Sequence, residues 1–466
     1  MDTKIFTPEK VIKYAETRLF GRNVAPEMAA KIELHNGALP SQLEQTLEKR
    51  YSSKSTTKFV TRVQQTNGRE PIYFVDGTLF IPQFSGFGRS IRYERMIEAY
   101  IQAISQRDGR KILFEAHDLE NDSRKTDQSY SNNAYDFVAG MFMPHGRYED
   151  RRVFAGDDIK DITTIIFGTP SAVRKAIREN GKDAKNAKDA KGAKVVAANI
   201  LAANVSAYGN SEYLEAQILE INNQRVLNIG YVFADQAGII IEKILREYNS
   251  LACKACKVHP KPNAHPQEAE QSASTINKSF PQKDEQHSQH PLTINMYMFG
   301  RVGGLSDNAQ RHQLVYPVGI IDWIDLNEGK VLEYPMHNVF AHNHNEDARF
   351  NEYHRSNDDN KSNERSRTPN NINGLTGLNL NVVSVVDETV EQLELAKQRG
   401  CICIEMETRE SVEAINQARR RYQQLKINFG FVGYVSDIPL IGDTLEQELD
   451  SDKGEQDAVN VILDRI

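Results

Sequence analysis

Acidic side chains near the C-terminal end stand where proton transfer to a small molecule could occur. Glu405 and Glu407 follow the apolar run 401–404, and Asp437 follows a second apolar run at 432–435. Runs this apolar and β-branched predict buried strands, so these acids would leave each strand where the sheet stops. Carboxyl groups in such places can donate protons or accept hydrogen bonds from a ligand.

The segment between the two runs predicts how the acids are positioned. Val412, Ile415 and Ala418 recur at helical spacing, with arginines on the other face of the helix. We therefore expect a strand-helix-strand unit that brings Glu407 and Asp437 to the same edge of a parallel sheet, where open α/β sheets bind ligands. The alternative is that both acids are solvated loop residues.

A glycine-rich stretch and a strand-to-helix turn are candidate anion sites. Glycines at 300, 303 and 304 would let a backbone approach a ligand closely, and Arg301 offers a planar fork for an anion. A tight turn with an exposed arginine is the alternative. Farther upstream, the strand 162–167 leads through Gly168 into a helix expected at 172–180. The free N–H groups at such a helix start favour phosphate.

Histidines and cysteines occur in two polar stretches. Cys253 and Cys256 are ligand types suited to zinc. The histidines near them are irregularly spaced, and the composition cannot bury a core, so we interpret this stretch as an insertion and predict no metal. A second group of histidines, in 337–373, is interpreted as solvated. These two groups are His259, His265, His287 and His290, and His337, His342, His344 and His354.

The whole chain has the bulk properties of a globular protein. Its 466 residues, 39% of them hydrophobic, are enough for two domains with proper cores. A net charge of −7 does not favour binding to nucleic acid or an anionic membrane. Without a long apolar run or a signal-like N-terminus, we expect a cytoplasmic protein, and four cysteines in so long a chain predict reduced thiols.

The patterning divides the chain into two expected domains. Residues 1–155 are expected to form an α+β domain, and 156–466 a βα-alternating domain with polar insertions at about 182–194, 250–290 and 337–373. In the first domain we expect helices at 11–19, 28–34 and 91–105, a hairpin at 72–81, a turn at 84–89 and a strand at 111–115. In the second we expect strands at 162–167, 195–205, 215–220, 225–230, 294–299, 314–323 and 381–386, and helices at 236–248, 388–399 and 455–466.

Five segments in register resemble the nucleoside phosphorylase and nucleosidase superfamily: 165–170, 226–230, 300–305, 404–407 and 435–440. The chain length, the preceding domain and the tail 439–444 resemble the long AMP nucleosidases in particular. The resemblance implies a three-layer αβα catalytic domain with a mixed sheet, preceded by an α+β domain for effector binding or assembly. It also implies a homo-oligomer and no metal or organic cofactor.

The resemblance also assigns roles to residues. Met406 would lie under the sugar ring, and Glu407, with Glu405 beside it, would accept hydrogen bonds from the 2′- and 3′-hydroxyls. Asp437, oriented by Ser436, would protonate N7 of a purine, and desolvation by neighbours such as Ile438 would favour its protonated form. Gly303 and Arg301 would belong to the same substrate site.

The phosphate anchors of the phosphorylases are largely missing. Where that family has two arginines and a serine, this chain has Ala172, Met298 and Arg301, and Arg174 lies two residues beyond its expected place. Gly168 and Arg174 remain candidates for phosphate contact. Arg301 would then be available for a 5′-phosphate or a regulatory phosphate.

The loss of these anchors favours water as the nucleophile, so we expect hydrolysis of AMP or a related purine nucleotide or nucleoside. The alternatives are a purine nucleoside phosphorylase that uses inorganic phosphate, and a catalytically inactive nucleotide-binding regulatory protein on the same fold.

Overall fold

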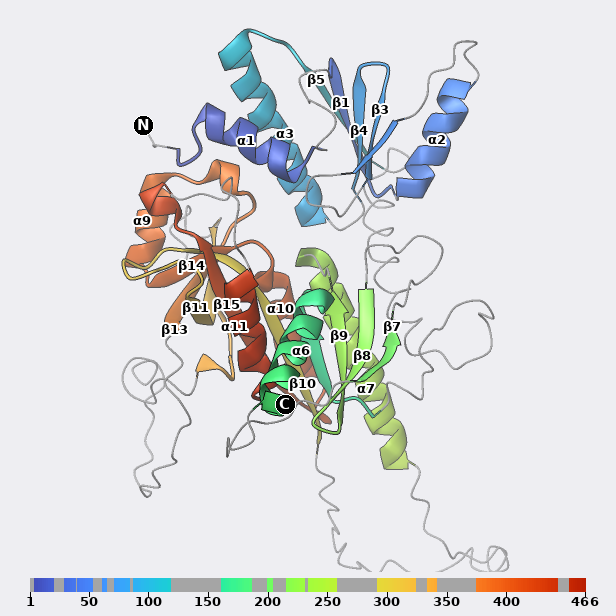
Figure 1. The fold of residues 1–466 in the computed structure, drawn as a ribbon, viewed down its shortest axis with the longest axis vertical. Coiled ribbons are helices and arrows are strands. Elements are labelled where there is room, and N and C mark those ends of the chain that lie inside the picture. The colour runs from blue at the N-terminus through green and yellow to red at the C-terminus, as the bar shows by residue number, and fades with distance from the viewer. Residues whose placement is uncertain are drawn as a thin grey trace, which may run out of the picture.

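The computed structural model contains two β-sheets, each with helices packed against it (Figure 1). It describes the following residues: 4–20, 29–38, 40–52, 61–64, 71–83, 87–118, 161–186, 199–203, 215–230, 234–257, 291–323, 333–341, 374–442 and 452–466.

The first sheet has five strands in the order β2-β3-β4-β1-β5. The central strand β1 runs parallel to both of its neighbours, β4 and β5. Helices α1 and α3 pack on one face and α2 on the other (Figure 1). The bounds are β1 Lys31–Asn36, β2 Thr61–Gln64, β3 Pro71–Val75, β4 Thr78–Gln83, β5 Leu113–Asp118, α1 Pro8–Arg18, α2 Pro40–Ser52 and α3 Phe87–Asp108.

The expected hairpin and two of the expected helices of this region are confirmed. β3 and β4 pair antiparallel around Asp76 and Gly77, whose φ angles of 55° and 77° are those of a tight hairpin turn. Helix α3 contains the expected 91–105, and α1 covers most of 11–19.

The helix expected at 28–34 is wrong, because this stretch leads into strand β1. Ile32 and Leu34 are fully buried on one face, while Glu33 points to the other. That alternation has the period of a strand, and pairing on both edges stabilises it. Helix α2 was not expected from the sequence. Of the turn expected at 84–89, residues 87–89 begin α3, and 84–86 lie outside the described residues.

The second sheet is mixed and has ten strands. Nine follow the order β12-β11-β13-β14-β10-β6-β9-β8-β7, and β15 pairs with both β10 and β11. The bounds are β6 Thr164–Phe167, β7 Asn199–Ala203, β8 Glu215–Ile221, β9 Gln224–Gly230, β10 Leu292–Gly304, β11 Leu314–Asp322, β12 Glu333–Pro335, β13 Gly374–Asn381, β14 Cys401–Glu405 and β15 Leu425–Asp437.

Helices cover both faces of this sheet. Along β10, Met296 and Met298 join a core with α7 and α10, whereas Tyr297 and Phe299 join a core with α6 and α11. The alternation follows directly from the two-residue period of a strand. The bounds are α6 Pro170–Asn186, α7 Ala234–Lys257, α9 Val390–Gln398, α10 Thr408–Arg421 and α11 Asp452–Leu463, with short 3-10 turns η5 Val385–Asp387 and η6 Pro439–Ile441.

Several expected boundaries differ from the observed ones. The glycine-rich stretch 300–304 is the final part of β10 rather than a turn. The strand expected at 381–386 is wrong, because β13 ends at Asn381 and the chain continues into η5. Two expected insertions begin as helix, since α6 runs to Asn186 and α7 to Lys257. Outside the described residues lie 187–194, 258–290, 342–373 and the expected domain boundary near 155.

The two sheets share a hydrophobic core. One cluster of buried side chains includes Leu34 and Ile97 from the first region and Leu380 and Ile404 from the second. The backbone N–H of Ile5 donates to Glu388 O at 3.1 Å, and Lys10 Nζ donates to Gly442 O at 3.1 Å. Helices α1 and α3 therefore share a core with strands β13 and β14. None of the described helices is long and apolar enough to cross a membrane.

Candidate active site

Gly303, near the end of β10, lies between the two acidic motifs. Its Cα is opposite Ile404 of β14 on one side and opposite Asp437 of β15 on the other. A Cβ on Gly303 would lie 2.7 Å from Ile404 Cγ2 and 3.6 Å from Asp437 Oδ2. The close approach of these strand ends thus requires glycine at this position.

The ends of β14 and β15 therefore converge, but not as the sequence predicts. The expected arrangement was a parallel sheet edge shared by the two strands. Instead β10 lies between them, parallel to β15 and antiparallel to the end of β14. Long strands that bend and change partners produce this arrangement, and local periodicity does not reveal it.

Asp437 is buried beside a serine. Asp437 is 6% exposed, and Ser436 Oγ lies 2.6 Å from Asp437 Oδ1. The same hydroxyl lies 3.3 Å from Val302 O. The strand pairing shifts by one residue here, between Val302 and Gly303, which places Asp437 rather than Ser436 opposite Gly303. Such an irregularity re-aims side chains at the end of a strand.

A second carboxyl group, Glu388, interacts with Asp437. It lies between η5 and α9 and is only 2% exposed. Burial raises the pKa of Glu388 well above its usual value, and the nearby charges of Asp437 and Asp387 raise it further. The sequence predicts Glu388 as the first residue of a helix, where an acid is ordinarily solvated, so the sequence does not indicate its burial.

Glu405 supports the turn that carries Met406 and Glu407. Its carboxylate accepts hydrogen bonds from the N–H of Glu407 at 2.5 Å and of Thr408 at 2.9 Å, and from Asn379 Nδ2 at 2.9 Å. Burial raises the pKa of Glu405, while these hydrogen bonds act in the opposite direction. Both of its oxygens are used to hold the start of α10, a task the sequence did not predict for it.

Glu407 and Met406 are held from the first region of the chain by Arg92 of α3. The Arg92 guanidinium contacts Glu407 Oε1 at 3.3 Å, Met406 O at 3.1 Å and Val383 O at 3.2 Å. The Arg92 side chain is 12% exposed and that of Glu407 is 42% exposed. Sequence reasoning missed Arg92, because it lies in a helix whose polar residues look like an ordinary solvated face.

Arg301 lies two residues before Gly303 on β10 and is exposed. Its Nε donates to the hydroxyl of Tyr434 at 3.2 Å, across the paired strand β15. Alternation along a strand puts the side chains of residues 301 and 303 on the same face. The structure therefore brings Arg301 to the side of the strand that faces Asp437 Oδ2.

The candidate phosphate turn at the start of α6 is held by buried amides. Gly168 N–H already donates to Ile229 O at 2.9 Å, and the Phe299 ring fills the space beside Gly168. Asn228 Nδ2 donates to Gly168 O at 3.1 Å, and Gln217 Nε2 donates to Asn228 Oδ1 at 2.7 Å. A network of this kind makes the turn rigid.

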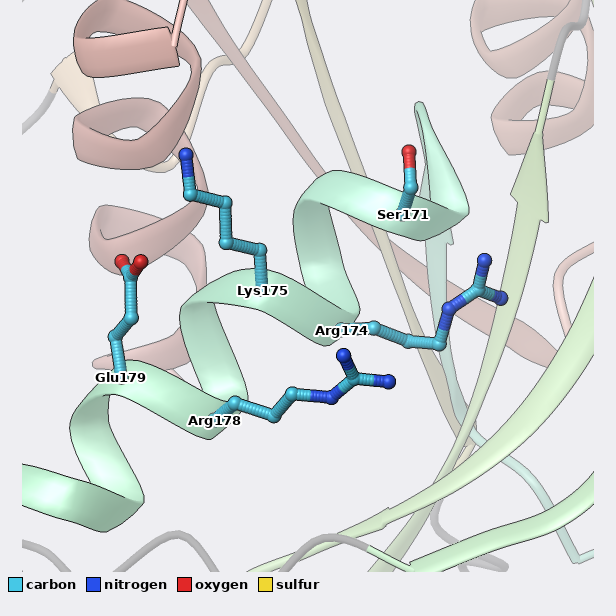
Figure 2. A pocket seen from close by; sticks show the side chains of 5 residues that line it. All are labelled: Ser171, Arg174, Lys175, Arg178 and Glu179. Atoms are coloured by element: carbon cyan, nitrogen blue, oxygen red, sulfur yellow. The ribbon is translucent and has the colours of Figure 1, made fainter.

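Arg174 joins that network and a basic surface cavity. Its Nη1 donates to Gln217 Oε1 at 2.7 Å. The cavity has a volume of about 370 Å³ and lies along α6, with Arg174 and Arg178 on one side of the helix (Figure 2). Its lining is Ser171, Arg174, Lys175, Arg178 and Glu179. Phe167, the last residue of the strand that leads to this turn, is opposite Met298 on β10.

A second cavity, of about 560 Å³, lies between the loop that follows β10 and helix α11. Its lining includes Arg311, His312 and Lys453. Neither of these two cavities is lined by Asp437, Glu407 or Arg301.

Comparison with known proteins gives similarity in structure only. No protein-family model matches the chain, and no curated protein matches its sequence. A uridine phosphorylase from Schistosoma mansoni in complex with thymidine is 10% identical, with a TM-score of 0.38 over 66% of this chain and 87% of that chain. A purine nucleoside phosphorylase from Toxoplasma gondii in complex with immucillin-H is 12% identical, with a TM-score of 0.35 over 69% of this chain and 96% of that chain.

Proposed function

We propose that this chain hydrolyses the N-glycosidic bond of a purine nucleotide or nucleoside, with AMP and water giving adenine and ribose 5-phosphate. The observation that carries the proposal is the convergence of two acidic strand ends on Gly303, with Asp437 buried and contacted by Ser436. The motif resemblance adds the substrate class. The long AMP nucleosidases are the group within that resemblance that we favour.

Asp437 acts as the general acid in this proposal. Cleavage of the C1′–N9 bond moves its electron pair onto the base, which is a poor leaving group as an anion. A proton from the Asp437 carboxyl to N7 neutralises the base, and water adds to C1′ and releases a proton. Ser436 has one hydroxyl proton to share between Val302 O and Asp437 Oδ1. When Val302 O accepts it, Ser436 does not donate to Asp437, and the Asp437 carboxyl can hold the proton that it delivers to N7.

Glu388 is proposed as the partner that maintains a proton beside Asp437. Its raised pKa, from burial and from the charge of Asp437, favours a neutral Glu388. Two coupled carboxyl groups lose their protons in steps that belong to the pair rather than to either residue. We assign Glu388 as a positioning residue that acts through Asp437, since no substrate contact is required of it.

The sugar is proposed to lie over Met406, with Glu407 accepting hydrogen bonds from its hydroxyls. The Glu407 side chain is 42% exposed while one of its oxygens contacts Arg92, so its carboxylate is oriented and still accessible. Glu405 is better assigned to holding this turn than to contact with substrate, because its oxygens are bound within the chain. Orientation of this kind lowers the entropic cost of reaching the transition state.

Water is favoured over phosphate because of the residues at the three anchor positions. Met298 and Ala172 are buried in hydrophobic cores, so neither position offers a cation to an anion. Arg174 is directed to Gln217, and it lines the basic cavity along α6. We propose Arg301 as the contact for a 5′-phosphate, because it shares a strand face with Gly303.

The test is release of base from AMP and adenosine, measured by chromatography for the full chain and for Asp437→Asn. We expect adenine release by the wild type and a loss of about 100-fold or more in kcat for the variant, which is the scale of general acid catalysis. Asp307→Asn is the matched control, because Asp307 is an exposed side chain paired with Lys397. Undiminished release by Asp437→Asn would overturn the proposal. Tight nucleotide binding without base release by the wild type would instead identify a binding protein.

A further inference from the structure

Two histidines and a glutamate form a cluster on the first sheet, far in sequence from the acidic motifs. Glu33 and His35 lie on β1 and His117 on β5, and their ligand atoms all lie within 4.8 Å of one another. The parallel register pairs Glu33 with Glu115 and His35 with His117, so the side chains face the same side of the sheet. The two imidazole rings stack with centroids 5.0 Å apart.

The spacing of these atoms suits one small cation. Glu33 Oε2 lies 3.2 Å from His35 Nε2 and 3.6 Å from His117 Nε2. A tetrahedral zinc ion, with bonds of about 2.0–2.1 Å, holds its ligand atoms about 3.3–3.4 Å apart. Small side-chain movements would therefore place all three atoms around a single ion.

The neighbouring residues occupy only part of the hydrogen-bonding capacity of Glu33 and His117. The Glu33 side chain is 5% exposed, and Lys31 Nζ binds its other oxygen, Oε1, at 2.8 Å. His117 Nε2 is buried and makes no hydrogen bond among the described residues, although Glu33 and Glu115 carboxylates are near it. A buried ring nitrogen without a hydrogen bond is costly unless something else occupies its lone pair.

Charged side chains surround the cluster. Burial lowers the pKa of His35, whereas its contact with Glu33 acts in the opposite direction. Arg50 Nη1 lies 4.0 Å from Glu33 Oε2 on a side chain that is 58% exposed. Lys31 also binds Glu115 Oε2 at 2.6 Å, which holds that carboxylate at the edge of the cluster.

We propose that Glu33, His35 and His117 bind a divalent transition-metal ion of the zinc type. Two imidazoles and one carboxylate are a ligand set that zinc and its first-row neighbours accept, and hard cations such as Mg²⁺ prefer oxygen alone. The fourth position is left for water or for Glu115. The ion would tie β1 to β5 across their parallel pairing and stabilise this part of the fold.

The experiment titrates the full chain with Co(II) and Zn(II) in a background carrying Cys253→Ser and Cys256→Ser, so that this thiol pair contributes no site. Calorimetry gives the zinc stoichiometry, and the visible spectrum of Co(II) reports its coordination geometry. We expect at least one zinc ion per chain in this background. His35→Asn and His117→Asn should each remove one equivalent of bound zinc, or weaken the zinc affinity by about 100-fold or more, since a direct ligand is lost. His312→Asn is the control, because His312 lies outside the cluster and its φ of 67° is one that asparagine tolerates.

Melting temperatures separate loss of the ion from loss of the fold. Without metal, the His117→Asn chain should melt near the temperature of the parent, and added zinc should raise the melting temperature of the parent only. Zinc stoichiometry unchanged by both His35→Asn and His117→Asn, or no binding by the parent, would overturn the proposal.

Discussion

The guanidinium of Arg92, on α3, lies 3.3 Å from the carboxylate of Glu407, at the start of α10. The two residues are 315 positions apart in the sequence, and the same guanidinium also holds the carbonyl oxygens of Met406 and Val383. A charge-assisted contact of a mostly buried arginine orients the carboxylate that we propose for the sugar hydroxyls. The first region of the chain is thereby connected to the candidate site.

Replacement of Arg92 with methionine tests this connection. The alkyl packing is kept while the hydrogen bonds are lost, so we expect KM for AMP to rise by about tenfold and kcat to fall less, because Glu407 loses its orientation. Steady-state kinetics measures both constants. Arg95→Met, at an exposed position on the same helix, is the control. An Arg92→Met enzyme whose KM matches that of Arg95→Met would contradict the role of Arg92.

Addition of one methyl group at Gly303 should destabilise the fold. The Cβ of Gly303→Ala would lie 2.7 Å from Ile404 Cγ2, so the strand ends must separate, and we expect a loss of about 1–3 kcal/mol in the free energy of unfolding. Base release should fall with it, since Asp437 Oδ2 lies beside the added methyl group. Urea denaturation measures the first effect.

Gly300→Ala is the matched control on the same strand, because its added Cβ would come no closer than 3.8 Å to Phe431. We expect the Gly300→Ala chain to unfold close to the wild-type urea midpoint. Equal destabilisation by both substitutions would show that the close approach of the strand ends at Gly303 does not require glycine.

The hydroxyl of Ser436 should matter for chemistry more than for binding. Ser436→Ala removes the 2.6 Å contact with Asp437 Oδ1. A hydrogen bond to the carboxylate that forms as Asp437 gives up its proton contributes about 1.5–3 kcal/mol, so we expect kcat to fall by about tenfold or more. The pH profile of kcat should shift as well, because the hydroxyl interacts with the ionising group. Ser306→Ala, in an exposed turn, serves as the control. An unshifted pH profile would count against Ser436 as the partner of Asp437.

Glu388 should make the stability of the fold depend on pH. Its folded-state pKa is raised above the usual 4.5, so the folded state binds a proton that the unfolded state has lost. That contribution is complete below pH 4.5 and is lost as the pH rises toward the folded-state pKa. Glu388→Gln removes the titrating group, so its melting temperature should fall less than that of the wild type between pH 5 and pH 8.

The control for this series is Glu391→Gln, at an exposed position of α9. We expect its melting temperature to follow the wild-type pH dependence. The role of the buried Glu388 carboxyl would be refuted if the melting temperature of Glu388→Gln changed with pH as steeply as that of the wild type.

Local patterns were enough to predict the elements that carry the acidic motifs. The apolar runs and the helical spacing of Val412 and Ile415 predict β14, α10 and β15 correctly. The Asp76-Gly77 turn predicts its hairpin, because few backbone conformations suit that dipeptide between two strands. These signals are local, so they do not depend on distant partners.

What could not be predicted depends on distant partners. Strand β1 is stabilised by pairing with β4 and β5, which outweighs the helical character that the sequence suggests for 28–34. The insertion of β10 between β14 and β15 is set by long-range pairing. Burial gives Glu388 its raised pKa, and contact with Arg92 orients Glu407. A single charged residue in a sequence carries no sign of such a partner.

The sugar product tests the central claim most directly. The full chain would be incubated with AMP, with and without inorganic phosphate, and the phosphorus NMR spectrum of the products recorded. We predict ribose 5-phosphate as the sugar product at the same rate in both conditions, because water attacks C1′. A second phosphate at C1′ of the sugar, formed only when inorganic phosphate is present, would contradict hydrolysis and identify a phosphorylase.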